Sequence, residues 1–249
     1  MKKLISIVTP VYNEEPIIAE FINTLYKVLL PLEQKYEFEI IFTDNASKDS
    51  TFSILEEFIS KDKRIKALRF SRNIGLNRSI HYGLSHASGD AVILIMSDME
   101  DPPSIIPQFI QHWEDGFEVV YGVMLSRKDS FILKRLRKIY YKIINKLSEF
   151  EIPENATEFR LTSKRINDEI IQFKDDNPYI RGLVAYLGFA QKKVLYHREK
   201  RSAGKSSFNY FDLLIFSINS LVTTTQAPTR AIVLIGLIIT VLSSIHFLY

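Results

Sequence analysis

The stretch AVILIMSDMEDPPS, residues 91–104, decides the fold. It runs from apolar residues into a group of acidic side chains, Asp98, Glu100 and Asp101, and then into two prolines, Pro102 and Pro103. A short apolar run is typical of a buried strand, and prolines end a strand and open a helix. The acidic side chains are therefore expected directly after a buried strand.

Carboxylates grouped at a strand end suggest a metal site. Mg²⁺ and Mn²⁺ prefer hard oxygen ligands, and they usually take one or two carboxylates together with substrate phosphates. We therefore predict that Asp98 and Glu100 hold Mg²⁺ or Mn²⁺. The alternative is an acidic helix N-terminus, where carboxylates complement the helix dipole. Three acids this close together after a buried strand favour the metal.

The same pattern of strand and helix extends over the first 125 residues. Strands are expected at 4–9, 39–43, 65–70, 91–95 and 118–123, and helices at 17–30, 50–60, 76–86 and 104–113. This alternation predicts an α/β fold, Rossmann-like, with a mostly parallel sheet and helices on both faces. Ligands of such sheets bind beyond the carboxyl ends of the strands. The residues just after each strand are therefore the candidates for function.

Two further strands also end in polar residues. The first ends in TPVYNE, residues 9–14, which offers an aromatic ring and polar groups to a ligand. The second ends in FTDNASKDST, residues 42–51, and places Asp44 where its carboxylate can accept a hydrogen bond from a nucleobase N–H. Ser47 and Asp49 also suit the start of a helix, so part of this motif is helix capping, and for Asp49 both interpretations stay open.

The chain changes character after residue 125. Between Arg127 and Lys146 there are eight basic residues and one acid, Asp129, and the apolar residues fall on one helical face. Such a helix lies either in the interface of an anionic membrane or on the domain as a solvated helix, and this stretch alone does not separate the two. A second amphipathic stretch is expected at 208–222.

The last 19 residues, 231–249, carry no formal charge. As a helix they would span about 28 Å, close to the roughly 30 Å hydrocarbon core of a bilayer. We predict a transmembrane helix over 229–249, with a buried core helix as the alternative. Arg230 precedes the tail, and cytoplasmic flanks are enriched in Lys and Arg, so residues 1–230 are expected in the cytoplasm. The predicted localisation is the cytoplasmic (inner) membrane, single-pass.

Composition narrows the class of protein. Apolar residues make up 46% and charged residues 24%, which excludes wholesale disorder. The chain has no cysteine, which excludes disulfides and thiolate metal sites. Its net charge is only +3, and we expect no nucleic-acid partner. A homo-oligomer stays possible.

The motifs resemble one family when they are taken in order. TPVYNE, DNASKD, SRNIGLNRSIHYGLSHASGD and SDMEDPP look like the family-2 inverting glycosyltransferases with the GT-A fold. The later segments VVYGVMLSR, ATEFRL, RGLVAYLGF and REKRSAGKSSFNYFDLL resemble the polyprenyl-phosphate hexosyltransferases, which include dolichyl-phosphate mannose synthases and bacterial undecaprenyl-phosphate glucosyltransferases. The resemblance covers essentially the whole chain. It implies a metal-dependent enzyme that moves a hexose from a UDP- or GDP-linked nucleotide-sugar to a polyprenyl phosphate at the membrane.

The resemblance also implies an organisation of the chain. A GT-A catalytic domain would cover residues 1–207, with a basic amphipathic insertion at about 127–148. An amphipathic juxtamembrane segment, 208–228, would then lead into the transmembrane helix. Many relatives continue into a second span, which leaves open whether this chain is a shortened form.

Roles follow residue by residue from the resemblance. The donor would be held by Pro10, Tyr12, Glu14, Asp44, Asn73 and Asp98, and the metal by Asp98 and Glu100. The acceptor phosphate or the donor diphosphate would be held by Arg127, Arg198, Arg201 and Lys205. Catalytic roles would fall to Asp98, Arg127 and Glu158, with Glu158 close to the reacting centre.

The chain departs from the family pattern at several of these positions. Met96 stands where relatives have the first acid of a D-x-D motif, and Asn45 replaces a frequent second Asp. Glu100 and Glu158 stand where Gln and Asp are usual, and Ser207 and Phe208 where many relatives have Lys and Tyr. Two alternatives therefore remain: a transferase that extends a soluble or lipid-linked glycan, and a degenerate nucleotide-sugar-binding protein without turnover.

Overall fold

The computed structural model describes residues 2–125, 131–148, 153–173, 175, 178–198, 225 and 227–248. The chain divides into two compact units. The first contains residues 1–128 and 153–205, and the second contains residues 129–152 and 206–249.

The first unit is built on one sheet. Its strands are β1 (Lys3–Val11), β2 (Tyr36–Asp44), β3 (Ile65–Arg69), β4 (Ala91–Leu94), β5 (Val119–Met124), β6 (Ala156–Ser163) and β7 (Gln191–Tyr196). They lie in the order β3-β2-β1-β4-β6-β5-β7. Every neighbouring pair is parallel except the two pairs made by β6, which runs antiparallel to β4 and β5.

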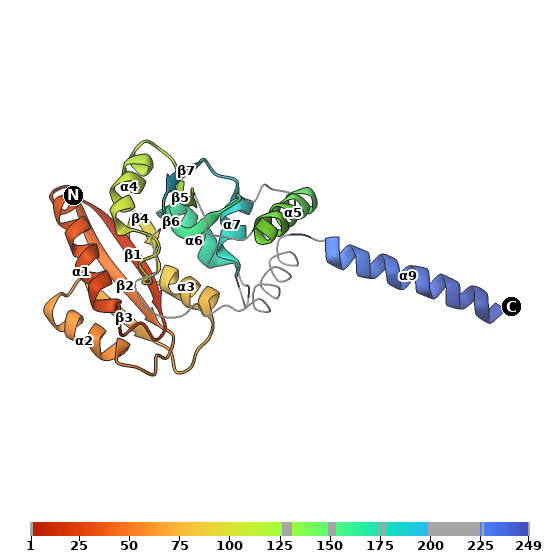
Figure 1. Ribbon diagram of the computed structural model, residues 1–249, viewed down its shortest axis with the longest axis horizontal. Coiled ribbons are helices and arrows are strands. Elements are labelled where there is room, and N and C mark those ends of the chain that lie inside the picture. Colours follow the sequence, from red (N-terminus) through yellow and green to blue (C-terminus); the bar gives the residue numbers. More distant parts are fainter. Residues whose placement is uncertain are drawn as a thin grey trace. The chain divides into compact units, whose positions relative to one another are not determined.

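Helices cover both faces of this sheet (Figure 1). They are α1 (Ile18–Leu29), α2 (Thr51–Lys61), α3 (Leu76–Ser85), α4 (Ile106–Glu114), α6 (Lys164–Gln172) and α7 (Ile180–Leu187), with short 3-10 turns at Leu30–Gln34 and Pro103–Ile105. Successive residues of a strand point to opposite faces. Ile7 accordingly packs in one apolar cluster with residues of α1, α2 and α4, and Val8 in another with residues of α3, α6 and α7. The predicted α/β fold with helices on both faces is confirmed.

The reversed direction of β6 determines what meets at the carboxyl edge of the sheet, meaning the edge where the parallel strands end. Leu94, at the end of β4, pairs with Arg160, so the first residues of β6 continue beyond the last residue of β4. The start of β6 therefore lies at the same edge as the loops that follow β1, β2, β4 and β7.

The second unit contains helix α5 (Phe131–Leu147), which forms where the basic amphipathic helix was predicted. Tyr141 and Ile144 are buried on one side. Its apolar residues Leu136, Ile139, Ile143 and Leu147 are between 43% and 57% exposed. The predicted amphipathic stretch 208–222 lies outside the described residues.

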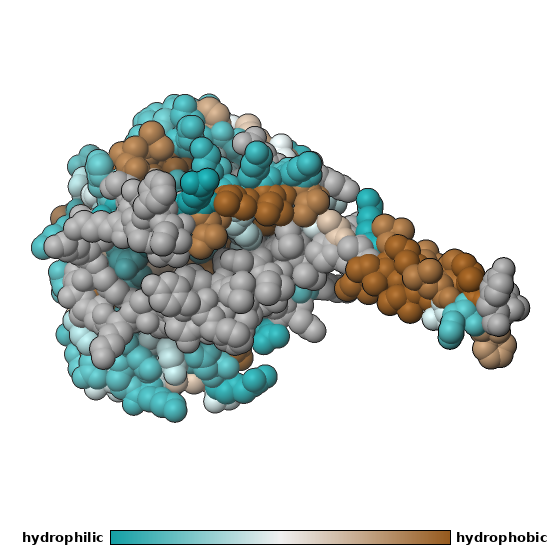
Figure 2. Space-filling model, turned by 45° about the vertical axis from the view of Figure 1, so that its right-hand side comes forward, coloured by the Kyte–Doolittle hydropathy of each residue, from teal (hydrophilic) through white to brown (hydrophobic). Residues whose placement is uncertain are grey.

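The second unit also contains α9 (Ala227–Leu248), which begins before the predicted span at 229–249. No helix in the described part of the chain is both long and apolar enough to cross a bilayer, so the predicted single-pass span is not supported. Within α9, the hydroxyls of Thr240 and Ser244 donate back to the carbonyls of Gly236 and Thr240, at 2.8 Å each. The large apolar side chains described between Ile232 and Phe247 are nevertheless each more than half exposed, and Figure 2 shows an apolar surface along the helix.

Candidate functional site

The loops after β1 and β2 are joined by hydrogen bonds at the carboxyl edge. The backbone N–H of Asn13 donates to Ser47 Oγ (2.9 Å), and the N–H of Lys48 donates back to Asn13 Oδ1 (2.8 Å). The N–H of Glu14 donates to Thr51 Oγ1 (2.8 Å). This bonding holds the predicted donor residue Tyr12 at the surface, where its ring is exposed.

Asp49 belongs to the same loop framework. Its carboxylate accepts the N–H of Thr51 at the start of α2 and the N–H of Glu15 from the neighbouring loop, both at 3.1 Å. These hydrogen bonds lower the pKa of Asp49 against the opposing effect of burial. Of the two interpretations of Asp49, the structure therefore shows the one at the start of the helix.

Asp44 lies at the tip of β2, where the sequence places it, but its carboxylate is fully buried. One oxygen accepts the N–H of Ser47 (3.1 Å), and the other lies 3.2 Å from Arg69 Nε. The Arg69 guanidinium in turn stacks over the ring of Phe52, 4.5 Å from its centroid. In this structure the Asp44 carboxylate is therefore not open to a ligand, and Arg69 and Phe52 lie beside it.

Other residues predicted to bind the donor lie on either side of Asp44. Pro10 is buried within β1 opposite Thr43. Asn73 is exposed in the loop after β3, and its side chain accepts the N–H of Gly75 (2.9 Å). The first unit thus brings Pro10, Tyr12, Glu14, Asp44 and Asn73 to the carboxyl ends of three adjacent strands.

The acidic loop after β4 has an unusual backbone. Met99 adopts φ = +58°, a conformation that costs energy for a residue with a side chain. The Met99 side chain is buried in the apolar core, which holds the turn in place. On either side, Asp98 and Glu100 stay partly exposed, and Asp98 Oδ1 accepts the N–H of Glu100 (3.1 Å).

Two of the acidic residues contact the end of β7. Asp101 is buried and accepts a hydrogen bond from the Tyr196 hydroxyl, which lies 3.0 Å from Thr157 Oγ1. Arg198 Nη2 lies 2.6 Å from Glu100 Oε2, and Arg198 Nε lies 3.4 Å from Asp101 Oδ1. Burial raises the pKa of Asp101, and Arg198 opposes that shift. Burial and Asp101 together raise the pKa of the Tyr196 phenol, which therefore stays a hydrogen-bond donor.

Of the two predicted metal ligands, Asp98 fits a metal ion better than Glu100 does. No group of three or more His, Asp or Glu side chains within the described ranges is arranged to hold a metal ion. Asp98 still fits as a single carboxylate ligand, because Mg²⁺ and Mn²⁺ can complete their shell with phosphates and water. Glu100, the second predicted ligand, has its carboxylate on Arg198 in this structure.

Glu158 occupies the start of β6 between two arginines. Glu158 Oε2 lies 3.0 Å from Arg160 Nη2, and Glu158 Oε1 lies 2.7 Å from Arg181 Nη2 of α7. Burial raises the pKa of Glu158, but the two guanidinium groups outweigh it and the pKa falls below its usual value. Glu158 is therefore ionised at neutral pH, and it can accept hydrogen bonds but not act as a general acid.

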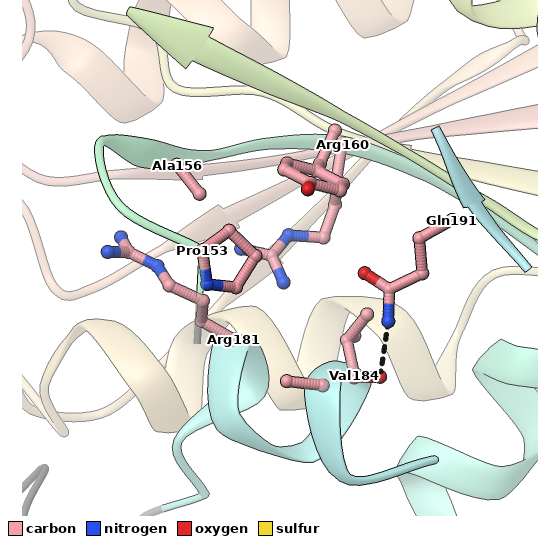
Figure 3. Close-up of a pocket in the computed structure, with 8 residues that line it drawn as sticks. Pro153, Ala156, Arg160, Arg181, Val184 and Gln191 are labelled. Carbon is pink, nitrogen blue, oxygen red and sulfur yellow. Dashed lines mark hydrogen bonds between the residues drawn. The ribbon is translucent and has the colours of Figure 1, made fainter. Parts of the chain in front are cut away.

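Arg160 and Arg181 also line a small pocket of about 250 Å³, including the space that opens to solvent (Figure 3). Gln191 closes one side, with Nε2 donating to the Val184 carbonyl (3.2 Å). Arg160, Arg181 and Tyr196 were not among the residues predicted from the sequence. Arg160 was detectable, because it stands two positions after Glu158 and shares its face of the strand.

Backbone strain collects at this edge. The described non-glycine residues with positive φ are Asn13, Ala46, Met99 and Asn155. They lie after β1, after β2, after β4 and just before β6. Residues in such conformations persist where the surrounding structure holds them, and they cluster at functional sites. The predicted phosphate-binding residues Arg127, Arg201 and Lys205 lie outside the described residues.

The sheet with helices on both faces matches solved structures of the GT-A fold class. The solved structure of a mannosyltransferase from Pyrobaculum calidifontis, in complex with GDP-Man and Mn²⁺, superposes with a TM-score of 0.54 at 16% identity, over 81% of this chain and 59% of that one. Glucosyl-3-phosphoglycerate synthase from Mycobacterium tuberculosis, in complex with Mn²⁺, UDP-glucose and phosphoglyceric acid, gives 0.60 at 18% identity, over 90% and 79%.

The family follows from the sequence comparison. Residues 6–171 match the family model described as glycosyl transferase family 2, and the chain belongs to that family. It is 36% identical to the bactoprenol glucosyl transferase of Shigella phage SfV, over 98% of this chain and 78% of the relative. It is 35% identical to the uncharacterized glycosyltransferase YkcC of Bacillus subtilis, over 98% and 74%. The predicted family membership is confirmed.

Proposed function

We propose that this chain transfers a hexose from a UDP- or GDP-linked nucleotide-sugar to a polyprenyl phosphate at the cytoplasmic face of a membrane, with inversion of the anomeric carbon. One observation carries the proposal: three separate segments, the loop after β4 with Asp98, the start of β6 with Glu158 and the end of β7 with Arg198 just beyond it, all lie at the carboxyl edge of the sheet. The name of the Shigella phage relative, bactoprenol glucosyl transferase, supports a lipid acceptor of this class.

In the proposed reaction a phosphate oxygen of the acceptor attacks the anomeric carbon. The bond from that carbon to the nucleoside diphosphate breaks on the opposite face, and the electron pair leaves with the diphosphate. The attacking phosphate is already anionic at neutral pH, so it needs no strong general base. The main work of the protein is to position two anions and to neutralise the charge of the leaving diphosphate.

The residues at the edge suit this work. Asp98 would hold Mg²⁺ or Mn²⁺, which supplies positive charge to the leaving diphosphate when bound. Arg198 offers a permanently charged guanidinium, which can bind a phosphate through two N–H groups. Glu158, kept ionised by Arg160 and Arg181, would accept hydrogen bonds from sugar hydroxyls close to the anomeric carbon.

The second unit supplies a way to reach a lipid. A helix that is apolar all round is usually buried in protein or in lipid, and α9 exposes apolar residues along its length. Helix α5 carries an exposed apolar side and several basic residues, which favours the surface of an anionic membrane. We therefore include attachment to the membrane through α9 and α5 in the proposal.

The function is tested by transfer. Radiolabelled UDP- and GDP-hexoses are incubated with the full chain in detergent and purified undecaprenyl phosphate, and the lipid fraction is separated by thin-layer chromatography. Label in a polyprenyl-phosphate sugar supports the proposal. Label that appears only on glycan acceptors indicates a glycan-extending enzyme. Donor binding without transfer to any acceptor indicates the binding-only alternative. That alternative is suggested by Met96, which replaces the first acid of the D-x-D motif.

Attachment is tested by ending the chain at Thr229. The shortened protein should bind anionic vesicles more weakly than the full chain, but still measurably, because α5 remains. It should use long polyprenyl acceptors poorly and short water-soluble analogues nearly normally. Unchanged turnover on vesicle-embedded lipid would show that α9 is not needed to reach the acceptor.

A further inference from the structure

Glu100 and Arg198 form an ion pair across two segments of the carboxyl edge. Glu100 lies in the loop after β4 and Arg198 just beyond β7, and Glu100 Oε2 lies 2.6 Å from Arg198 Nη2. The two side chains are 23% and 27% exposed, so water screens the pair only partly. A charge-assisted bond of this length is among the stronger polar contacts of the edge.

Asp101 holds the same arginine much less tightly. Its Oδ1 is already hydrogen-bonded to the Tyr196 hydroxyl. Arg198 Nε lies 3.4 Å from that oxygen, and this nitrogen is buried without a hydrogen-bond partner. Among the residues that the structure describes, Glu100 is therefore the one that holds the Arg198 guanidinium most closely.

The backbone around Glu100 is held in a fixed conformation, which keeps the Glu100 side chain next to Arg198. Met99, which directly precedes Glu100, has φ = +58° and a side chain anchored in the apolar core. The N–H of Glu100 is bound to Asp98 Oδ1. With both the turn and the N–H held, the Glu100 side chain starts from a fixed point next to Arg198.

We propose that Glu100 restrains Arg198 and so sets the affinity of the site for the donor diphosphate. This inference rests on the proposed function, in which Arg198 binds a phosphate. A carboxylate and a diphosphate compete for the same guanidinium N–H groups, so the diphosphate must displace Glu100 or share Arg198 with it. Glutamine has the length of glutamate but no charge, and a change of Glu100 to Gln releases Arg198 without shortening the side chain.

The proposal reverses the effect that a metal ligand at Glu100 would have. If Glu100 restrains Arg198, the substitution Glu100→Gln should tighten binding of UDP or GDP in the presence of EDTA by about three- to tenfold, a gain typical of one charge-assisted contact. Calorimetry on the full chain in detergent measures this directly, without turnover. The gain should disappear when Arg198 is also replaced, so that Glu100→Gln with Arg198→Ala binds like Arg198→Ala alone.

The control removes one carboxylate elsewhere. Glu114 pairs with Lys3 (3.1 Å) at the opposite end of the sheet, so Glu114→Gln makes the same change of charge and should leave nucleotide affinity unaltered. Thermal unfolding of each variant confirms that it is folded. Weaker or unchanged binding by folded Glu100→Gln, when the wild type binds, overturns this inference alone. If the wild type binds neither UDP nor GDP with or without Mn²⁺, the proposed function itself fails.

Discussion

The two ends of the sheet hold buried carboxylates in very different surroundings. At the end opposite the site, Glu39 accepts hydrogen bonds from Ser6 Oγ (2.5 Å) and from the N–H of Ser88 (2.7 Å), and it pairs with Lys66 (2.7 Å). At the carboxyl edge, Asp101 shares its oxygen with Tyr196 beside an Arg198 nitrogen that lacks a hydrogen bond.

This difference distinguishes a carboxylate that stabilises the fold from carboxylates that belong to a binding site. A fully bonded carboxylate stabilises the fold, whereas polar groups left partly satisfied beside strained backbone mark a site that gains its partners on binding. The described non-glycine residues with positive φ, such as Asn13 and Met99, all lie at the carboxyl edge, and none of them lies at the Glu39 end. We expect substitutions at the carboxyl edge to lower activity more than stability, and substitutions at the Glu39 end to lower stability more than activity.

The largest expected effect is at Asp98. Asp98→Asn removes one negative ligand from a partly exposed loop, so turnover should fall on the order of 10²- to 10³-fold, as when one charge-stabilising group is lost. The unfolding free energy should stay within about 0.5 kcal/mol of the wild type. Transfer assays and thermal unfolding check both. Asp115→Asn, at the exposed end of α4, is the matched control, and undiminished turnover of Asp98→Asn or full activity in EDTA would exclude the metal role.

At the opposite end, Glu39→Gln should reverse this pattern. Loss of the ionised acceptor leaves buried groups poorly paired and should lower the unfolding free energy by about 2–3 kcal/mol. Nucleotide binding at temperatures where the protein is folded should not change. Urea unfolding measures the loss, and Glu37→Gln, an exposed position on the same strand, is the control. A loss of donor affinity at Glu39→Gln would erase the distinction between the two ends.

A substitution of Glu158 should lower both turnover and stability. Its carboxylate pairs with a buried arginine, Arg160, and lies at the edge of the site. Glu158→Gln should lower turnover about tenfold, the range of one charged hydrogen bond, and should lower stability by about 1–2 kcal/mol. The rise in KM should be smaller than the fall in kcat if Glu158 acts near the reacting carbon. An effect confined to stability would make the residue purely structural.

The smallest expected effect is a dependence of stability on pH. Hydrogen bonds and Lys66 outweigh burial and lower the pKa of Glu39 from 4.5 to about 2. A lowered pKa gives stability that is full above the unfolded value and is lost as pH falls toward the folded value. The stability difference between the wild type and Glu39→Gln should therefore shrink by about 1 kcal/mol between pH 5 and pH 3.5. Urea titrations at the two pH values measure it, and a constant difference would contradict the lowered pKa.

The sequence predicted the first half of the fold well. The strands expected at 4–9 and 91–95 form as Lys3–Val11 and Ala91–Leu94, and the helix expected at 76–86 forms as Leu76–Ser85. Apolar runs buried on both faces and helices with clear periods are strong local signals. The insertion of β6 between β4 and β5 was not predictable, because pairing order depends on long-range contacts that no local pattern shows.

The site was predictable in its place more than in its contacts. Residues such as Asp98 and Asp44 were expected at strand ends and lie there. The partners were not: Glu100 binds Arg198 from the far end of the domain, and Asp44 binds Arg69. An ion pair between distant segments requires the folded geometry, and a carboxylate's sequence neighbours do not reveal it.

The direction of β6 makes the segment between β5 and β6 an exchangeable module. Val123, near the end of β5, pairs with Ala156, the first residue of β6, so the chain leaves the sheet and returns to it at adjacent points. Helix α5 is therefore carried on a connection whose two ends lie next to each other in the sheet. Loop-closure cost grows slowly, by about 0.6 kcal/mol for each doubling of length. We therefore expect that this segment can be lengthened, shortened or exchanged, in evolution or by engineering, while the register of the seven-stranded sheet is left intact.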